Sequence, residues 1–276
     1  MTARDQHKWS PVLRPIVRQM MSKLYLTAGA LLIASAAIIA TAAEIPLDQR
    51  TSAYPGMSRE TRAMQDDDTA NPATLWVLDG ETLWGTKAGA VNKACADCHA
   101  EGSMKGVAAR YPALRGGKVF DLEQRINLCH TGQQKAAAPF PFESRELLAL
   151  TAFIGRQSRG EPIAIDETKL EPAIEMGRKI FFERQGQLSL ACAQCHNDNW
   201  DRQLAGSPVG QAHPTGYPIY RLEWQSLGSL QRRLRNCMVG MRAEPYALGS
   251  PEFVALEAFL MYRARKMKIE TPAVRP

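Results

Sequence analysis

The chain has 276 residues, of which 45% are hydrophobic, and a formal net charge of +6. This length is enough for one large or two small domains, and the composition is ordinary for a soluble globular protein. The first 42 residues hold five Lys/Arg and one Asp, so the remainder carries about +2, which gives no argument for nucleic-acid binding.

An apolar run occupies residues 24–43, with basic residues before it and small residues at its end. The Ala-Thr-Ala sequence at 40–42 matches an A-x-A cleavage site. We therefore expect residues 1–42 to be a signal peptide that directs the chain to the periplasm and leaves no membrane span after cleavage. An uncleaved anchor is the alternative, because the run is long for a signal peptide. Translation starts at Met1 or Met21.

Residues 43–75 contain an acidic run at 66–68 and little periodicity. We expect them to form an N-terminal arm that lies on the surface and is not a third domain.

Two C-x-x-C-H motifs carry the clearest chemistry in the chain. In this motif the two thiols bond the vinyl groups of a c-type haem, and the adjacent histidine reaches the iron as its proximal ligand. An exported chain with two such motifs is predicted to carry two covalent c-type haems. The motifs are ACADCH, with Cys95, Cys98 and His99, and ACAQCH, with Cys192, Cys195 and His196.

The two halves of the chain resemble each other beyond these motifs, which implies one fold used twice. The matching segments are GETLW (80–84) and GRKIF (177–181), Tyr-Pro at 111–112 and 217–218, RINLC (125–129) and RLRNC (233–237), and ELLALTAFI (146–154) and EFVALEAFL (252–260).

Each half is predicted to be mostly helical. Apolar residues recur at helical spacing in 146–154 and 252–260. An opening helix, C-x-x-C-H, an irregular loop and a closing amphipathic helix resemble the class I cytochrome c fold. We therefore expect a mostly α protein with two tandem domains, 76–160 and 161–276, joined by the charged link 156–172 with its two prolines.

A second axial ligand is needed on the far side of each haem. Cys129 and Cys237 occupy matching positions in the loop before the closing helix, and a thiolate is a strong anionic ligand. Several alternatives remain open. They are a Cys129–Cys237 disulfide, buried inert thiols, ligation by Met104, Met238 or Met241, and competition from His130 at the first iron.

The second single cysteine differs from the first in its surroundings. Only Arg125 precedes Cys129 closely, whereas Arg232, Arg233, Arg235 and Arg242 surround Cys237. Such a cluster is either a solvated basic face or a site for a small anion, since arginine makes bidentate contacts with oxyanions. If the segment is helical, Arg233 and Cys237 share a face.

The two haem motifs, the spaced single cysteines and the segment RNCMVGMRAEP (235–245) resemble the SoxA family, the haem subunits of the SoxAX cytochromes of bacterial thiosulfate oxidation. The resemblance covers nearly the whole mature chain, including NPATLW (71–76). Some family members lack the first haem motif, and this chain is similar to the dihaem form.

The resemblance implies oxidative conjugation of thiosulfate to a cysteine of the carrier SoxYZ, with electrons passed to SoxX, a small monohaem cytochrome that forms a heterodimer with SoxA. It implies that Cys237 is the catalytic residue, carrying a persulfide, and that Arg233 binds substrate. It also implies His99 and Cys129 as ligands of the first iron, and His196 and Cys237 as ligands of the second.

Other functions remain open from the residues themselves. One is a dihaem thiosulfate dehydrogenase that forms tetrathionate without a carrier. Another is a non-enzymatic dihaem electron carrier, and a third is a dihaem peroxidase, which needs an open iron site.

Overall fold

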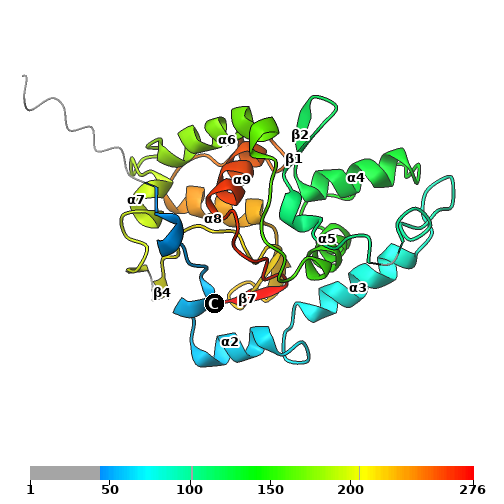
Figure 1. The fold of residues 1–276 in the computed structure, drawn as a ribbon, viewed down its shortest axis with the longest axis horizontal. Helices are drawn as coiled ribbons and strands as arrows, with labels where there is room; N and C mark the ends of the chain where they lie inside the picture. Colours follow the sequence, from blue (N-terminus) through cyan, green and yellow to red (C-terminus); the bar gives the residue numbers. More distant parts are fainter. Residues whose placement is uncertain (1–43, 101, 205) are drawn as a thin grey trace, which may run out of the picture. The chain divides into compact units, whose positions relative to one another are not determined.

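The computed structural model describes residues 44–100, 102–204 and 206–276, and the predicted signal peptide lies outside them. This part of the chain is mostly helical, with short strands between the helices (Figure 1). Within it, no helix has the length and apolarity that a bilayer span requires.

The first repeat follows a short N-terminal segment and contains a hairpin between its helices. The N-terminal segment holds the 3-10 turns η1 (Leu47–Gln49) and η2 (Tyr54–Gly56) and helix α2 (Arg59–Asp66). The repeat holds α3 (Thr74–Gly85), η3 (Ala108–Arg110), β1 (Ala113–Arg115), β2 (Lys118–Phe120), α4 (Leu122–Gly132) and α5 (Arg145–Gln157).

The second repeat contains counterparts of α3, α4 and α5, namely α6, α8 and α9, and adds helix α7 and more strands. It holds α6 (Glu167–Phe182), α7 (Cys192–His196), β3 (Gln203–Leu204), β4 (Ser207–Pro208), β5 (Ile219–Arg221), β6 (Ser226–Gly228), α8 (Leu230–Gly240), α9 (Pro251–Arg263) and β7 (Ala273–Arg275).

The same helix crossing occurs in both repeats. Helix α3 packs against α5, and α6 packs against α9. A Cβ atom on Gly80 or Gly177 would overlap the carbonyl oxygen of Ala149 or Ala255, respectively. Only glycine allows two backbones to approach this closely. The predicted opening and closing helices are confirmed, and the sequence repeat is a structural repeat.

The segments that carry the two single cysteines are helices, so the prediction of a loop there is wrong. Asp121 and Ser229 cap α4 and α8, each accepting a hydrogen bond from the backbone N–H three residues on. Such a cap satisfies a free donor of the first turn. Neither helix contains a proline, and each ends at a glycine.

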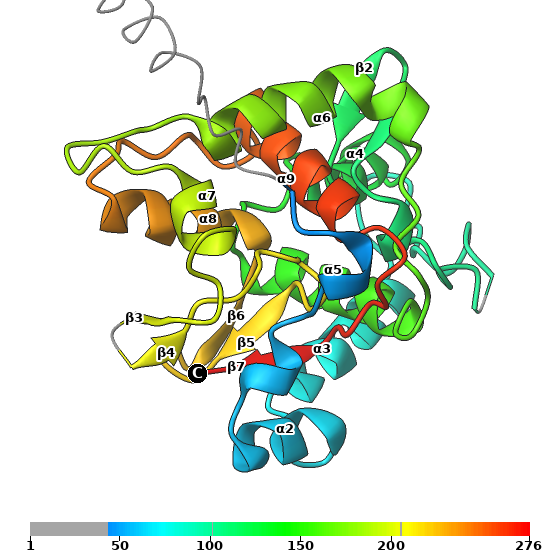
Figure 2. The same ribbon diagram turned by 60° about the vertical axis from the view of Figure 1, so that its left-hand side comes forward.

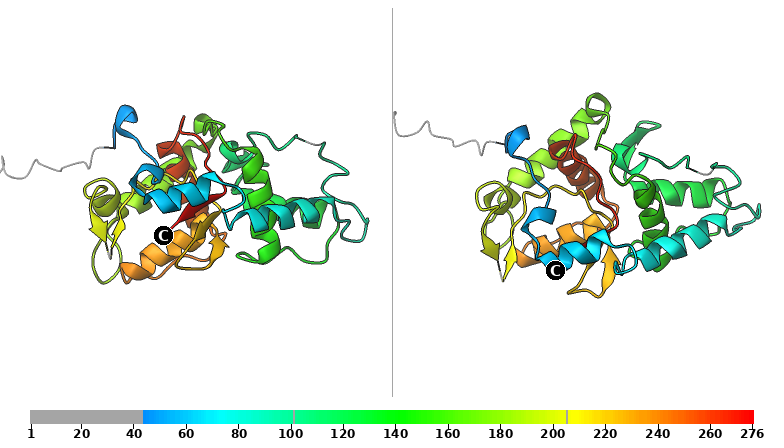
Figure 3. Two further views of the ribbon diagram at one scale, coloured as in Figure 1. Left: turned by 90° about the horizontal axis from the view of Figure 1, so that it is seen from below. Right: turned by 60° about the horizontal axis from the view of Figure 1, so that its bottom comes forward.

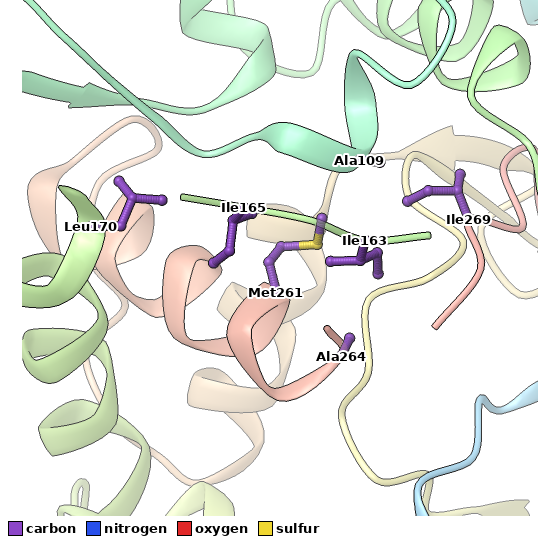
Figure 4. Packing of buried hydrophobic residues seen from close by; sticks show 7 residues of the cluster. All are labelled: Ala109, Ile163, Ile165, Leu170, Met261, Ala264 and Ile269. Atoms are coloured by element: carbon purple, nitrogen blue, oxygen red, sulfur yellow. The ribbon is translucent and has the colours of Figure 1, made fainter. Parts of the chain in front are cut away.

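The link between the repeats is part of the core. Ile163 and Ile165 are only 1% and 7% exposed, and they pack with Ala109 of the first repeat and Met261 of the second (Figure 4). Helix α6 begins within the predicted link and continues through Pro172, so residues 167–172 are helical. The two repeats therefore share apolar core at their junction.

The N-terminal segment is hydrogen-bonded to residues near the C-terminus. Gln65 and Asn71 are buried, and Asn71 Nδ2 donates to the carbonyl of Pro272 over 3.0 Å while the Val274 N–H donates to Gln65 Oε1 over 3.2 Å. Figure 2 shows α2 beside β7, and Figure 3 shows α2 leading directly into α3.

A small sheet joins this segment to the second repeat. Strand β5 pairs antiparallel with β6 and parallel with β7. Its Tyr220 stands opposite Leu227 and Val274, and these three pack in one core cluster with Ala73 and Leu148 from the first half of the chain. The described N-terminal segment and the C-terminal strand therefore pack together with both repeats.

Candidate haem sites

The first site is a cavity of about 660 Å³, a size typical of cofactor pockets. Its wall includes Cys95, Cys98 and His99, which follow α3, and Cys129, which lies on α4. Burial raises the pKa of the Cys95 thiol to about 11, and the neighbouring Cys129 thiol is the next cause. All the predicted haem-binding residues of this repeat thus line one cavity.

Two other ligand candidates line the same cavity. Met104 contributes to its wall, and so does His130. The His130 ring stacks on Phe140 with a centroid distance of 4.0 Å, and its Nδ1 lies 2.7 Å from Gln134 Oε1. These contacts hold the His130 ring in place beside Cys129.

The predicted haem-binding residues of the second site lie on two helices: Cys192, Cys195 and His196 on α7, and Cys237 on α8. Burial raises the pKa of the Cys192 thiol to about 12, and the Cys237 thiol on α8 is the next cause. The same two causes raise the pKa of Cys195. The Cys237 thiol thus acts electrostatically on both motif thiols, as Cys129 acts on Cys95 in the first site.

The histidine that the sequence predicts as proximal ligand of this site is oriented by the backbone. His196 Nδ1 donates to the Gly210 carbonyl over 2.6 Å, which leaves Nε2 free to bind iron. Burial lowers the pKa of His196, with the charges of Arg263 and Arg233 acting in the same direction. The neutral ring is the form that ligates a metal.

Two alternative roles for the sulfur side chains are removed. All six cysteines are described and free, so Cys129 and Cys237 do not form a disulfide, and they belong to separate sites. Met238 is 4% exposed and packs in a core cluster with Ala243 and Phe253. Its role is packing.

The arginines around Cys237 do not form one cluster. The Arg232 guanidinium lies 4.3 Å from the Trp224 ring centroid and 3.7 Å from Glu143, whereas the Arg233 charge acts on His196. Arg235 and Arg242 are exposed. Arg233 is therefore the arginine of α8 that turns toward the haem site.

Sequence reasoning missed residues that surround Arg233. Burial raises the pKa of Tyr217 to about 12, and Arg233, Arg221 and Cys237 all act on it electrostatically. Arg221 is half-buried, and its pKa is lowered by burial and then by Arg233. In the sequence, the Tyr-Pro pair at 217–218 stood out only because it recurs in both repeats. No pattern marked Arg221.

The comparisons with known proteins agree with this geometry. The model of the SoxA/TsdA cytochrome c domain matches residues 79–163 and 176–269. The L-cysteine S-thiosulfotransferase subunit SoxA of Pseudaminobacter salicylatoxidans is 35% identical over 83% of this chain and 82% of its own, and that of Rhodovulum sulfidophilum is 34% identical over 83% and 81%.

A solved structure shares the fold. The SoxXA structure from P. pantotrophus matches with a TM-score of 0.80 and 30% identity, over 82% of this chain and 87% of the solved chain. The helical repeat with its two sets of Cys and His side chains is thus a tandem cytochrome c fold that uses c-type haem. The chain belongs to the SoxA family of c-type cytochromes.

Proposed function

We propose that this chain is the catalytic dihaem subunit that joins thiosulfate to a cysteine of the carrier SoxYZ. In this reaction the carrier's S–H bond breaks, an S–S bond forms to the outer sulfur of thiosulfate, and one proton and two electrons leave. The electrons pass to a partner cytochrome c. The name of the relatives, L-cysteine S-thiosulfotransferase subunit SoxA, supports this reaction.

Each repeat would hold one haem, covalently bound by Cys95 and Cys98 in the first and by Cys192 and Cys195 in the second. The first cavity suits the group, because both thiols, a histidine and a third thiol line about 660 Å³ of mostly apolar space. The second site offers the same donor set. A bound haem supplies a one-electron acceptor to this chemistry.

The iron ligands would be His99 and Cys129 in the first site and His196 and Cys237 in the second. A thiolate ligand would favour the oxidised iron relative to a thioether. The hydrogen bond from His196 to Gly210 supports this assignment, since it fixes the ring tautomer for ligation.

Cys237 would carry the sulfur chemistry as a persulfide, whose outer sulfur takes part in thiol–disulfide exchange. Arg233 would hold the sulfonate group through its planar fork of donors. The observation that carries this proposal is that the Cys237 thiol acts electrostatically on the motif thiols of α7 and Arg233 acts on the His196 ring, while the adjacent Arg232 stacks on Trp224.

We further propose a SoxX-like monohaem cytochrome as heterodimer partner, because the solved relative is a SoxXA complex. The mature chain would act in the periplasm after loss of residues 1–42. It would consist of an arm (43–75), a first cytochrome domain (76–160) and a catalytic second domain (161–276).

A pair of matched variants tests the proposal. Cys237→Met should give a haem protein that reduces and reoxidises but forms no carrier conjugate, because the exchanging sulfur is gone. Cys129→Met, at the equivalent position, should shift the first haem's potential and keep most of the activity. The assay is mass spectrometry of the carrier after incubation with thiosulfate, and of the peptide containing Cys237 for an added sulfur.

The reverse pattern, an active Cys237→Met and an inactive Cys129→Met, would place catalysis in the first repeat. Tetrathionate as the product in the absence of carrier would instead indicate a thiosulfate dehydrogenase.

A further inference from the structure

The largest fully buried side chain among the described residues is a cation. Arg263, the last residue of α9, is 2% exposed. Its Nη2 donates to Asn197 Oδ1 over 2.8 Å and to the Gln211 carbonyl over 3.3 Å. Within the described chain its Nε and Nη1 are buried and have no hydrogen-bond partner. Such incomplete satisfaction of a buried guanidinium is costly.

No carboxylate of the described residues pairs with this guanidinium. Glu44 is the acid with the largest effect on its pKa, but Glu44 is paired with Arg50 at 3.5 Å, and Arg50 adds a second positive charge. Aromatic faces support the cation instead, with the Phe181 and Phe259 ring centroids 4.6 Å and 5.8 Å from the guanidinium carbon. A net positive charge therefore remains in the protein interior.

This charge lies close to His196, the proposed proximal histidine of the second site, and acts on it electrostatically. The Phe181 ring on which Arg263 stacks has its centroid 6.4 Å from that of His196. Asn197 follows His196 in the chain, and Gln211 follows Gly210, whose carbonyl accepts the His196 hydrogen bond. Arg263 thus contacts the residues next to both members of that hydrogen bond.

The first repeat lacks the charge. The repeat aligns residues 146–154 with 252–260, so that Gln157, the last residue of α5, corresponds to Arg263, the last residue of α9. The aromatic pair is retained there, with Trp84 5.5 Å from both Phe153 and the His99 ring. The aromatic pair beside the histidine is thus common to both repeats, whereas the position of the buried Arg263 is held in the first repeat by the partly exposed amide of Gln157.

We propose that Arg263 is a positioning residue that raises the reduction potential of the second haem through its buried charge. Reduction adds an electron to the site, and a nearby cation in a poorly solvated interior stabilises the reduced form. This opposes the effect of the anionic Cys237 thiolate and allows the catalytic haem to accept electrons. The inference rests on the haem assignment proposed above.

The test is a redox titration of the purified dihaem protein, followed by electron paramagnetic resonance. The signal that disappears in Cys237→Met identifies the second haem. Arg263→Gln, which copies the first repeat, should lower the midpoint potential of that signal and leave the other unchanged. Arg263→Lys retains a cation but not the planar guanidinium, and its midpoint potential should stay close to that of the parent.

Two results would overturn the proposal. An unchanged potential in Arg263→Gln would mean that the charge has no effect at the iron. An equal fall in Arg263→Lys would mean that hydrogen-bond geometry acts and the charge does not. Where Arg263→Gln does not incorporate haem, Arg263→Met, which is uncharged and of similar length, decides: it should lower the second haem's potential, and an unchanged value refutes the idea.

These outcomes are separable from the proposed function. Haem number and the carrier conjugate formed by Cys237 are measured by mass, and neither measurement depends on the potential of the second haem.

Discussion

Adjacent arginines of one helix have different partners. Arg232 stacks on Trp224, while Arg233, four residues before Cys237, acts on His196 and Tyr217. One turn of α8 separates the Arg233 and Cys237 side chains along the same face. The direction of each side chain, and not the number of arginines nearby, therefore selects the candidate for anion binding.

Arg233→Lys should lower the rate of carrier conjugation although it keeps the charge, because a lysine lacks the planar fork. Loss of a charged contact costs about 1.5–3 kcal/mol, or about 10- to 100-fold in kcat/KM. Arg232→Lys is the matched control and should remain near the parent rate. Equal rates for Arg233→Lys and the parent would place the anion site elsewhere.

At the scale of elements, the two glycine crossings set how closely the opening and closing helices approach. Each one brings the aromatic pair of its repeat against the proximal histidine, Trp84 with His99 and Phe181 with His196. The distance between the helices therefore also affects how the aromatic ring packs beside the histidine.

Gly80→Ala should destabilise the protein, since the new methyl group would overlap the Ala149 carbonyl. Overpacking of this kind costs about 1–3 kcal/mol, measured as a lower Tm or a lower denaturant midpoint. Gly85→Ala, at the end of the same helix with open space around it, should cause no loss. Equal stability of the two variants would contradict the close crossing.

At the scale of the whole molecule, the junction of the repeats encloses acidic side chains. Asp121 and Glu123 from the first repeat and Glu257 from the second line a cavity of about 80 Å³. Burial raises the pKa of Asp121 to about 6, and it raises the pKa values of Glu123 and Glu257, with the negative charge of Asp121 adding to both. The folded protein thus holds protons that the unfolded chain would release.

The sign of the pH dependence follows from these raised pKa values. Protonation of these buried carboxyl groups contributes fully to stability below the pKa of an ordinary carboxyl group, near pH 4. This contribution is lost as the pH rises through about 6, the pKa of Asp121, and above. Glu123→Gln should therefore raise Tm by a few degrees at pH 7 and have little effect at pH 4. Exposed Glu171→Gln is the control, and a Tm gain that is the same at both pH values would contradict the linkage.

The mature protein should carry two covalent haems and begin near Ala43. The paired C-x-x-C-H motifs and the Ala-Thr-Ala site at 40–42 motivate this expectation. Intact mass of the exported protein measures both parts. A mass with one haem would contradict the first, and retention of residues 1–42 would contradict the second.

The sequence by itself determined the tandem cytochrome c fold, because covalent haem chemistry requires Cys and His at invariant local spacing, and the repeat keeps that spacing in both halves. It also paired the opening and closing helices and matched Cys129 with Cys237. These features are local or periodic, so a linear pattern records them.

Only the tertiary structure decided which partners the arginines of α8 have, how deeply the link is buried, and that Arg263 lies close to His196. Ile163 lies between residues far apart in the chain, and Arg263 contacts Asn197 and Gln211, more than 50 residues earlier. Contacts of this range depend on how the helices cross, which no local pattern specifies. The loop predicted around Cys129 and Cys237 was wrong for a related reason, since the caps at Asp121 and Ser229 begin helices there.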